Sequence, residues 1–153
     1  GYALNKYKIE LSDEDEGSIN SIEEVLRKHR NQPISLNYVI ETTSYNPKRV
    51  GDLMHVLIEN GKAESLGDNL FMHIEHLNHL KKIINEYFKD EDSLNISDFK
   101  KLTGLTRKTA IPLLEYLDKK KYTIRSGNVR IMGESNEKRN WSQYASNEAV
   151  SWG

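Results

Sequence analysis

The sequence has no cysteine and only three prolines among 153 residues. Without cysteine the chain cannot form a disulfide, a thiolate zinc site or a cysteine nucleophile, and this composition suits a reducing compartment. No run approaches the roughly 18 consecutive apolar residues of a membrane span, and no signal peptide is recognisable. We therefore expect a cytoplasmic protein without membrane contact.

The sequence also lacks the motifs that most catalytic and nucleotide-binding sites require. It contains no Walker-type glycine loop, no GxGxxG and no GxSxG. Three histidines, His73, His76 and His79, follow one another at intervals of three, whereas helical zinc pairs usually stand four apart. We expect them to form a solvated, partly packed helix face, and we predict no metal site, no cofactor and no catalysis in this chain.

The chain as a whole has almost no net charge, but its two parts carry net charges of opposite sign. The 22 basic and 23 acidic residues nearly cancel. Residues 1–92 hold 11 Lys and Arg against 17 Asp and Glu, a charge of −6, whereas residues 93–132 hold 9 against 3, a charge of +6. Only the second segment has the charge of a polyanion-binding surface, with a surface of mixed charge as the alternative.

What the sequence does contain is a repeated order of helical and hairpin patterns. Each copy begins with a helix, continues with two shorter helices joined by a turn, and ends in a hairpin, centred at 67–69 and at 126–128. A shift of sixty positions superposes Lys48 on Lys108, as a duplicated unit would. This order predicts a mainly α fold with small β-wings, composed of two tandem winged-helix (winged helix-turn-helix) modules.

Four segments follow from these patterns. We place the first winged helix at residues 12–72 and the second at residues 73–132. Residues 1–11 contain an alternating strand pattern, which we interpret as the remnant of a preceding module. Residues 133–153 are polar and aperiodic, which indicates a flexible tail. The acidic hairpin of the first module, at 64–68, favours a spacer or docking role for that module.

Two basic residues of the second module stand at the start of its second turn-joined helix. The segment Thr106-Arg107-Lys108-Thr109 offers hydroxyls for capping and two cations beside the backbone N–H groups of a helix N-terminus. All of these groups direct donors toward one place, which predicts a phosphate-binding helix tip. Because Pro112 cannot donate to the carbonyl of Lys108, we expect the first turn to be bent or separately capped.

The wing of the second module supports the same interpretation. If residues 126–129 form its loop, Ile124 pairs with Ile131 and is expected to face the core, while Arg125 pairs with Arg130 on the opposite face. Like charges directly opposite one another cost stability unless an anion lies over them. The pattern therefore predicts an anion-binding wing, with an exposed wing and incidental arginines as the alternative.

Residues 96–118, ISDFKKLTGLTRKTAIPLLEYLD, closely resemble the C-terminal winged helix of bacterial selenocysteine-specific elongation factor (SelB). The most specific part is RKxAIPLLEY at 107–116, and the resemblance extends through the wing at 125–130 and more loosely back to about Ile19. It implies that the two modules are the third and fourth of four winged helices. These follow an elongation-factor-like GTPase, which we expect to lie outside this chain.

The resemblance further implies binding of an mRNA hairpin, the selenocysteine insertion element (SECIS), which tethers the factor to the mRNA for UGA recoding. GTP, magnesium, the ribosome and selenocysteinyl-tRNA are implied for the full-length factor only. No dimerisation segment is apparent, and we expect a monomer. The residues expected to contact RNA are Thr106, Arg107, Lys108, Arg125, Ser126, Gly127, Asn128 and Arg130.

Two other functions are compatible with the predicted fold. A winged-helix DNA-binding regulator would normally be a symmetric dimer with a helix in the major groove. A protein-docking module would use the same fold without nucleic acid.

Overall fold

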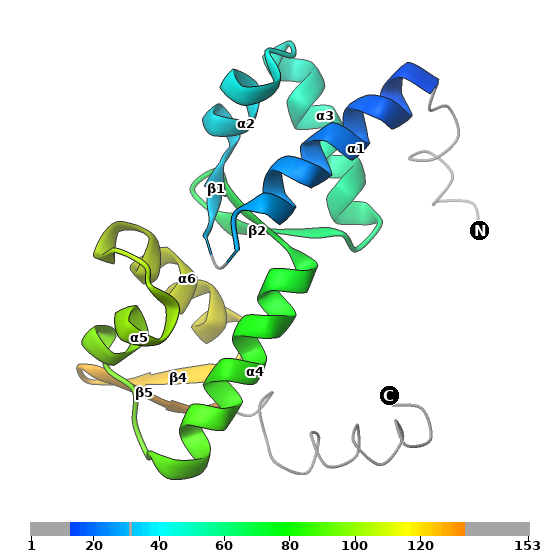
Figure 1. Ribbon diagram of the computed structural model, residues 1–153. Helices are drawn as coiled ribbons and strands as arrows, with labels where there is room; N and C mark the ends of the chain where they lie inside the picture. Colours follow the sequence, from blue (N-terminus) through cyan, green and yellow to red (C-terminus); the bar gives the residue numbers. More distant parts are fainter. Residues whose placement is uncertain (1–12, 31, 134–153) are drawn as a thin grey trace, which may run out of the picture. The chain divides into compact units, whose positions relative to one another are not determined.

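The computed structural model describes residues 13–30 and 32–133 (Figure 1). The predicted strand remnant at 1–11 and the predicted tail beyond Gly133 lie outside the described residues. The chain divides into two compact units between His79 and Leu80. This division lies seven residues after the boundary at 72/73 that we predicted. It lies within one continuous helix, α4 (Ile74–Asp90).

The first unit has three helices and a small antiparallel sheet. The strand order is β1-β3-β2, with Ile34 opposite Phe71. The short strand β1 has no counterpart in the order of helices and hairpins that the sequence predicts. The Ser35 side chain accepts a hydrogen bond from the Tyr38 backbone N–H, and this cap separates the strand from the helix that follows. The elements are α1 (Asp13–Lys28), β1 (Ile34–Ser35), α2 (Leu36–Thr43), α3 (Pro47–Glu59), β2 (Ala63–Gly67) and β3 (Leu70–His73).

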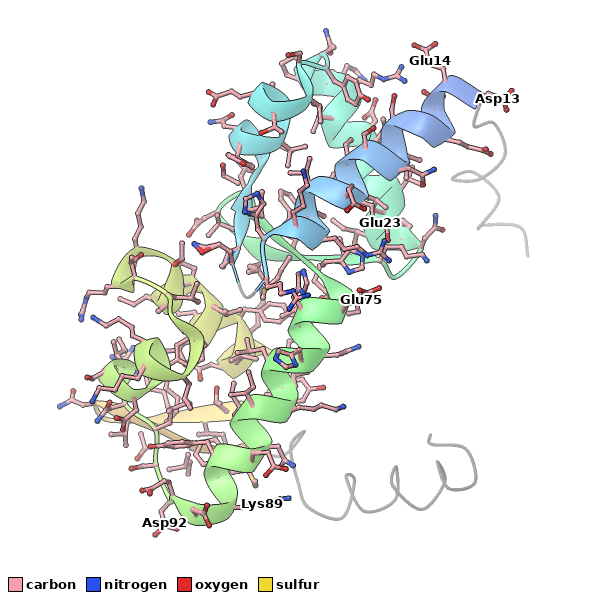
Figure 2. The ribbon with its side chains drawn as sticks, viewed as in Figure 1. Asp13, Glu14, Glu23, Glu75, Lys89 and Asp92 are labelled. Atoms are coloured by element: carbon pink, nitrogen blue, oxygen red, sulfur yellow. The ribbon has the colours of Figure 1, made fainter. Side chains whose placement is uncertain are left out.

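Four consecutive acidic residues, 13–16, form the first turn of α1. Asp13 and Glu14 extend from the first turn of α1 (Figure 2), where carboxylates are favourable beside the positive end of the helix dipole. The apolar face of α1 packs with α2 and α3 in one buried core. Its members include Ile22, Leu26, Val39, Val50, Met54 and Leu57.

The second unit repeats this arrangement from α4 onward. Its first strand is reduced to a single bridge between Leu94 and Arg130, whose backbone groups exchange two hydrogen bonds of 2.8 Å. The remaining elements are α5 (Ile96–Thr103), α6 (Arg107–Lys119), β4 (Thr123–Ser126) and β5 (Val129–Met132). Its fully buried side chains include Leu80, Ile84, Leu94, Phe99, Leu113 and Leu117.

The helix ends of the two units correspond residue by residue at an offset of sixty. Ser35 and Asn95 cap the second helix of each unit. Thr43 and Thr103 each donate to the carbonyl four residues before, both at 2.8 Å. The helices α2 and α5, and likewise α3 and α6, have equal lengths and begin sixty residues apart. The predicted pair of winged helices is therefore confirmed.

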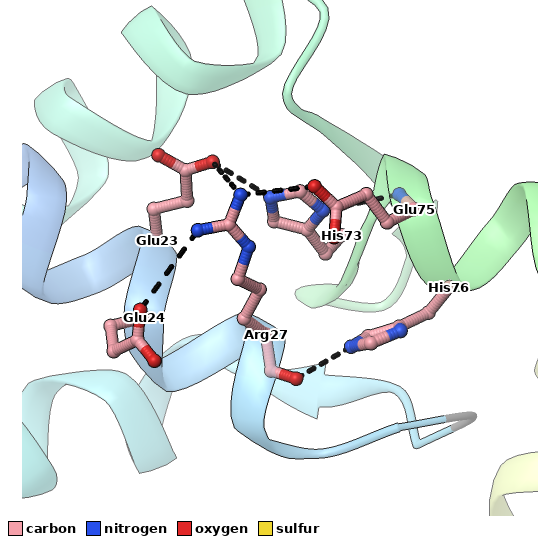
Figure 3. Close-up of polar contacts among 6 residues, drawn as sticks. All are labelled: Glu23, Glu24, Arg27, His73, Glu75 and His76. Atoms are coloured by element: carbon pink, nitrogen blue, oxygen red, sulfur yellow. Dashed lines mark hydrogen bonds and ion pairs between the residues drawn. The ribbon is translucent and has the colours of Figure 1, made fainter.

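A polar cluster attaches the start of α4 to α1 (Figure 3). The buried His73 ring accepts a hydrogen bond from the Glu75 backbone N–H through Nδ1, so its Nε2 donates to Glu23 at 2.8 Å. Arg27 pairs with Glu75 at 2.9 Å, and its hydrogen bond lowers the pKa of that carboxyl. His76 Nε2 donates to the Arg27 carbonyl at 2.6 Å. These histidines therefore serve packing within the first unit.

Two kinds of feature are absent from the part of the chain that the structure describes. No group of three or more metal-binding side chains occurs in residues 13–30 and 32–133. No helix within the same ranges has the length and apolar character needed to cross a bilayer.

Candidate nucleic-acid interface

The N-terminus of α6 has no side-chain cap. Thr106 occupies the cap position with extended backbone angles, but its hydroxyl makes no capping hydrogen bond, so the expected capping by this residue is wrong. The Thr106 carbonyl accepts from Thr109 and Ala110, within the helix that it precedes. The first backbone N–H groups of α6 are therefore left for another acceptor, such as a phosphate.

In the first unit, the N-terminus of the equivalent helix α3 is capped by a side chain. The Asn46 side chain accepts from the backbone N–H groups of Lys48 and Arg49 at 2.8 and 3.3 Å. An N-terminus that is already capped by its own side chain has fewer free donors for a ligand. The two units thus share a fold but differ at the helix tip.

The cations beside the two helix tips differ in the same way. In the first unit Lys48 pairs with Asp52 at 3.3 Å, and Arg49 pairs with Asp15 at 3.0 Å. In the second unit Arg107 and Lys108 are exposed, and neither pairs with a carboxylate of the residues that the structure describes. The charge of the α6 tip is therefore available to an external anion.

Pro112 accounts for part of this difference. It stands sixty positions after Asp52, so Lys108 has no carboxylate one turn ahead of it. The helix α6 runs without interruption from Arg107 to Lys119, and Pro112 lies inside it. The first turn is therefore not a separately capped element, contrary to one of our two expectations for this proline.

The wing has the predicted register but the opposite orientation. Ile124 lies opposite Ile131, and Arg125 lies opposite Arg130, as expected. However, Ile124 and Ile131 are 42% and 39% exposed, whereas Arg130 is only 5% exposed. Our expectation that the isoleucines face the core and that both arginines face solvent is wrong.

The cause is Asp118 in the last turn of α6. Arg130 donates to its carboxylate through Nε and Nη2, with a shortest N–O distance of 2.9 Å. Thr123 donates to the same carboxylate at 2.6 Å. A partly buried carboxylate requires such donors, and they must come from the inner face of the hairpin. The spacing of Asp118 to Arg130 was visible in the sequence, but it is one possible pairing among many.

The other predicted wing residues are exposed. Arg125 donates from Nε to the Gly127 carbonyl at 3.3 Å, which holds its side chain beside the turn. Gly127 has a φ of 64°, which favours glycine. The predicted contact residues that the structure places at the surface are Thr106, Arg107, Lys108, Arg125, Ser126, Gly127 and Asn128, whereas Arg130 is buried.

Comparisons with known proteins agree with this fold. Residues 86–132 match the family model described as elongation factor SelB, winged helix. The selenocysteine-specific elongation factor of Desulfomicrobium baculatum is 31% identical over 98 residues, which are 64% of this chain and 16% of that protein. The chain therefore spans less than two thirds of the relative that it matches.

Two solved structures are similar to about four fifths of this chain. One is the mRNA-binding domain of elongation factor SelB from E. coli in complex with SECIS RNA, with a TM-score of 0.71 and 19% identity over 80% of this chain and 99% of that chain. The other is bacterial selenocysteine-specific elongation factor EF-Sec, with a TM-score of 0.62 and 28% identity over 82% of this chain and 20% of that chain. The first likeness concerns the fold alone.

The duplicated fold, in which the α3 tip is capped and the α6 tip is open, defines a tandem winged-helix protein. The family match covers most of the second unit, and the relatives extend the likeness to the first. The chain is similar to the C-terminal winged-helix region of SelB, in agreement with the resemblance of residues 96–118.

Proposed function

We propose that the second unit binds an mRNA hairpin, the selenocysteine insertion element, through the α6 tip and the wing. Binding would tether a selenocysteine-specific elongation factor to the mRNA where a UGA codon is recoded. The observation that carries this proposal is the contrast between the two helix tips. Asn46, Asp52 and Asp15 occupy the donors of the first tip, whereas those of Arg107 and Lys108 remain open.

The geometry suits a hairpin better than a regular duplex. The major groove of A-form RNA is too deep and narrow for a helix, so a winged helix has to use its tip and wing on the backbone and on loop bases. The exposed residues of α6 and of the β4–β5 turn provide such contacts. The SelB domain of E. coli, which has the same fold, was solved with SECIS RNA.

The individual residues have different roles in this proposal. Arg107, Lys108 and Arg125 meet phosphates, while Thr106 and the wing-tip residues provide smaller polar contacts. Arg130 holds the wing to α6 through Asp118 and does not reach the RNA. GTP, magnesium, the ribosome and selenocysteinyl-tRNA would be engaged by the rest of the factor, and this chain would act as a monomeric anchor.

The test compares the affinity of the chain for a selenocysteine insertion hairpin with its affinity for duplex DNA at the same salt concentration. We expect tighter hairpin binding. Arg107→Ala together with Lys108→Ala should weaken it roughly 10- to 100-fold and make the salt dependence shallower by about two units of slope, since about one is lost per phosphate contact.

The matched control is Lys48→Ala, which removes a cation from the closed tip of the first unit and should leave hairpin affinity unchanged. Equal affinity for hairpin and DNA would support the DNA-binding regulator instead. An unaffected double variant would favour the protein-docking module.

A further inference from the structure

Three consecutive lysines, Lys119, Lys120 and Lys121, stand at the C-terminal end of α6, and we call them the lysine cluster. All three side chains are exposed, and none forms an ion pair with a carboxylate of residues 13–30 and 32–133. The Lys120 ammonium group lies 5.8 Å from the centre of the Tyr116 ring, a contact that leaves its charge in place. The cluster thus presents three positive charges that the proposed function does not use.

Cations at a helix C-terminus can serve the helix itself, by compensating its dipole or by donating to its last carbonyl groups. In α6, backbone groups already satisfy these carbonyls. The Lys121 backbone N–H donates to the Asp118 carbonyl at 3.0 Å, and the Tyr122 backbone N–H donates to the Leu117 carbonyl at 2.9 Å. The lysine side chains are therefore not needed to close the last turn.

The helix α3 of the first unit ends in the same backbone arrangement without these lysines. The residues sixty positions before the cluster are Glu59, Asn60 and Gly61. The two backbone hydrogen bonds recur there at the same distances, 3.0 and 2.9 Å, and the C-cap residues of both helices have a φ of −87°. An acid, an amide and a glycine are thus sufficient for this helix end, and the three charges are a feature of the second unit.

The backbone at Lys121 is a second, independent observation. Lys121 has a φ of 65°, in the left-handed region that favours glycine, and its counterpart Gly61 has a φ of 74°. Any side chain at this position strains the backbone, because its Cβ comes close to the following carbonyl oxygen. A lysine here disfavours the folded turn and adds an exposed charge, so we interpret it as a binding residue.

The lysine cluster lies away from the residues that we propose to contact the hairpin. Lys119 follows Arg107 by twelve residues, which corresponds to about 18 Å along the axis of α6 at about 1.5 Å per residue. The strand β4 then runs from Thr123 at the base of the wing to Ser126 at its tip. Figure 1 shows that the turn between α6 and β4 lies at one end of the second unit and the β4–β5 turn at the other. A hairpin held by the α6 tip and the wing tip therefore leaves the cluster accessible.

We propose that the lysine cluster binds the phosphate backbone of a second RNA, a regular duplex, while the hairpin occupies the α6 tip. A lysine ammonium group is a flexible point charge, which suits phosphate contacts that carry no sequence information. A regular RNA duplex offers phosphates and 2′-hydroxyls and conceals most of its base edges. Three cations are fewer than the roughly four to eight of a cluster that recognises an anionic membrane. This inference goes beyond the proposed function, since the second unit then bridges two RNA molecules.

The test measures the binding of a short labelled RNA duplex without unpaired bases to the whole chain. Two forms of the chain are used, in which the α6 tip is either occupied by one equivalent of unlabelled hairpin or altered by Arg107→Ala with Lys108→Ala. We expect the duplex to bind to both forms. In each form, Lys120→Asn together with Lys121→Gly should weaken duplex binding roughly tenfold and make the salt slope shallower by about two.

The matched control is Lys100→Gln together with Lys101→Gln, which removes two lysines from the last turn of α5 and should leave duplex binding unchanged. Because a φ of 65° suits glycine, Lys121→Gly should not lower the melting temperature. The proposal is overturned if the cluster variant binds the duplex as tightly as the wild type. It is also overturned if one equivalent of hairpin displaces the duplex from the wild-type chain, since a single surface would then bind both.

A second measurement needs no variant of the protein. The wild-type chain is treated with an amine-acetylating reagent with and without the duplex, and the modified lysines are identified by mass spectrometry. We expect the duplex to protect the lysine cluster and to leave Lys100 and Lys101 reactive. Protection of Lys108 without the cluster refutes the proposal. Protection of the cluster by vesicles of phosphatidylserine and phosphatidylcholine, but not by the duplex, would assign it to a membrane surface instead.

The outcomes separate the lysine cluster from the proposed function. If Arg107→Ala with Lys108→Ala leaves hairpin affinity unchanged, the proposed function fails, while a loss of duplex binding in the cluster variant still supports the cluster. If the hairpin affinity of that double variant falls but the cluster variant binds the duplex like the wild type, the cluster proposal fails alone.

Discussion

Removal of the Arg130 side chain tests whether this residue holds the wing or binds RNA. From the sequence we predicted the same role for Arg125 and Arg130. In the structure Arg125 is exposed, whereas Arg130 is buried against Asp118. We therefore expect Arg130→Ala to lower the free energy of unfolding, and Arg125→Ala to leave it almost unchanged. Only Arg125→Ala should lower hairpin affinity without an effect on stability.

The magnitude follows from the contacts of the pair. Removing one partner of a fully buried ion pair costs about 3–5 kcal/mol, because the other charge is left without compensation. The side chain of Arg130 is 6% exposed, but that of Asp118 is 23% exposed, so water recovers part of its solvation. Thr123 also remains as a donor to Asp118. We expect a loss of about 2–4 kcal/mol, a large part of the roughly 5–15 kcal/mol of a small domain.

Urea denaturation followed by circular dichroism measures this loss, and amide hydrogen exchange in β4 and β5 assigns it to the second unit. Arg125→Ala should change the free energy of unfolding by less than about 0.5 kcal/mol, as for an ordinary surface position. The assignment is refuted if Arg130→Ala costs less than 0.5 kcal/mol, or if Arg125→Ala costs as much as Arg130→Ala.

Three further substitutions test the local structure. Asn95→Ala removes the cap of α5 and should cost about 1 kcal/mol in urea denaturation, and no change would mean that the cap is immaterial. Gly133→Ala should lower the melting temperature, because the added Cβ would collide with backbone atoms. Gly17→Ala, which adds a methyl group in open space on α1, should raise the free energy of unfolding by about 0.5–1 kcal/mol. The reverse order of the two effects would contradict this geometry. His73→Ala should cost more than about 2 kcal/mol, since Glu23 loses its buried partner, and a neutral result in denaturation would disprove the role of this ring.

The helical elements were predictable because their signals are local. Apolar periodicity, caps such as Asn95 and the turn at Gly104 act within a few residues, and they delimit α5 at both ends. The strand β1 was missed because two residues carry no period, and it exists only through its pairing with β3. The same holds for the bridge between Leu94 and Arg130.

The position of the candidate site could be predicted from the sequence, but the pairing of its cations with carboxylates could be predicted only in part. The sequence shows Lys48 and Lys108 at equivalent positions beside a helix start, and the residue four positions later, Asp52 in one case and Pro112 in the other, is a local signal that only Lys48 has a carboxylate partner. Arg49 in the first unit meets Asp15 across 34 positions, which only folding brings together. Only the pairing of Arg49, and not that of Lys48, therefore required the tertiary structure.

The duplicated winged-helix fold, the basic second unit and the register of its wing could be predicted from the amino-acid sequence, because periodicity and turn residues act over short distances. Which face of that wing meets solvent depends on a contact between the wing and α6. Alternation makes the two faces distinct, but the carboxylate of Asp118 selects the inner one, because it requires the donors of Thr123 and Arg130. Arg130 is thereby buried, and the isoleucines are left at the surface.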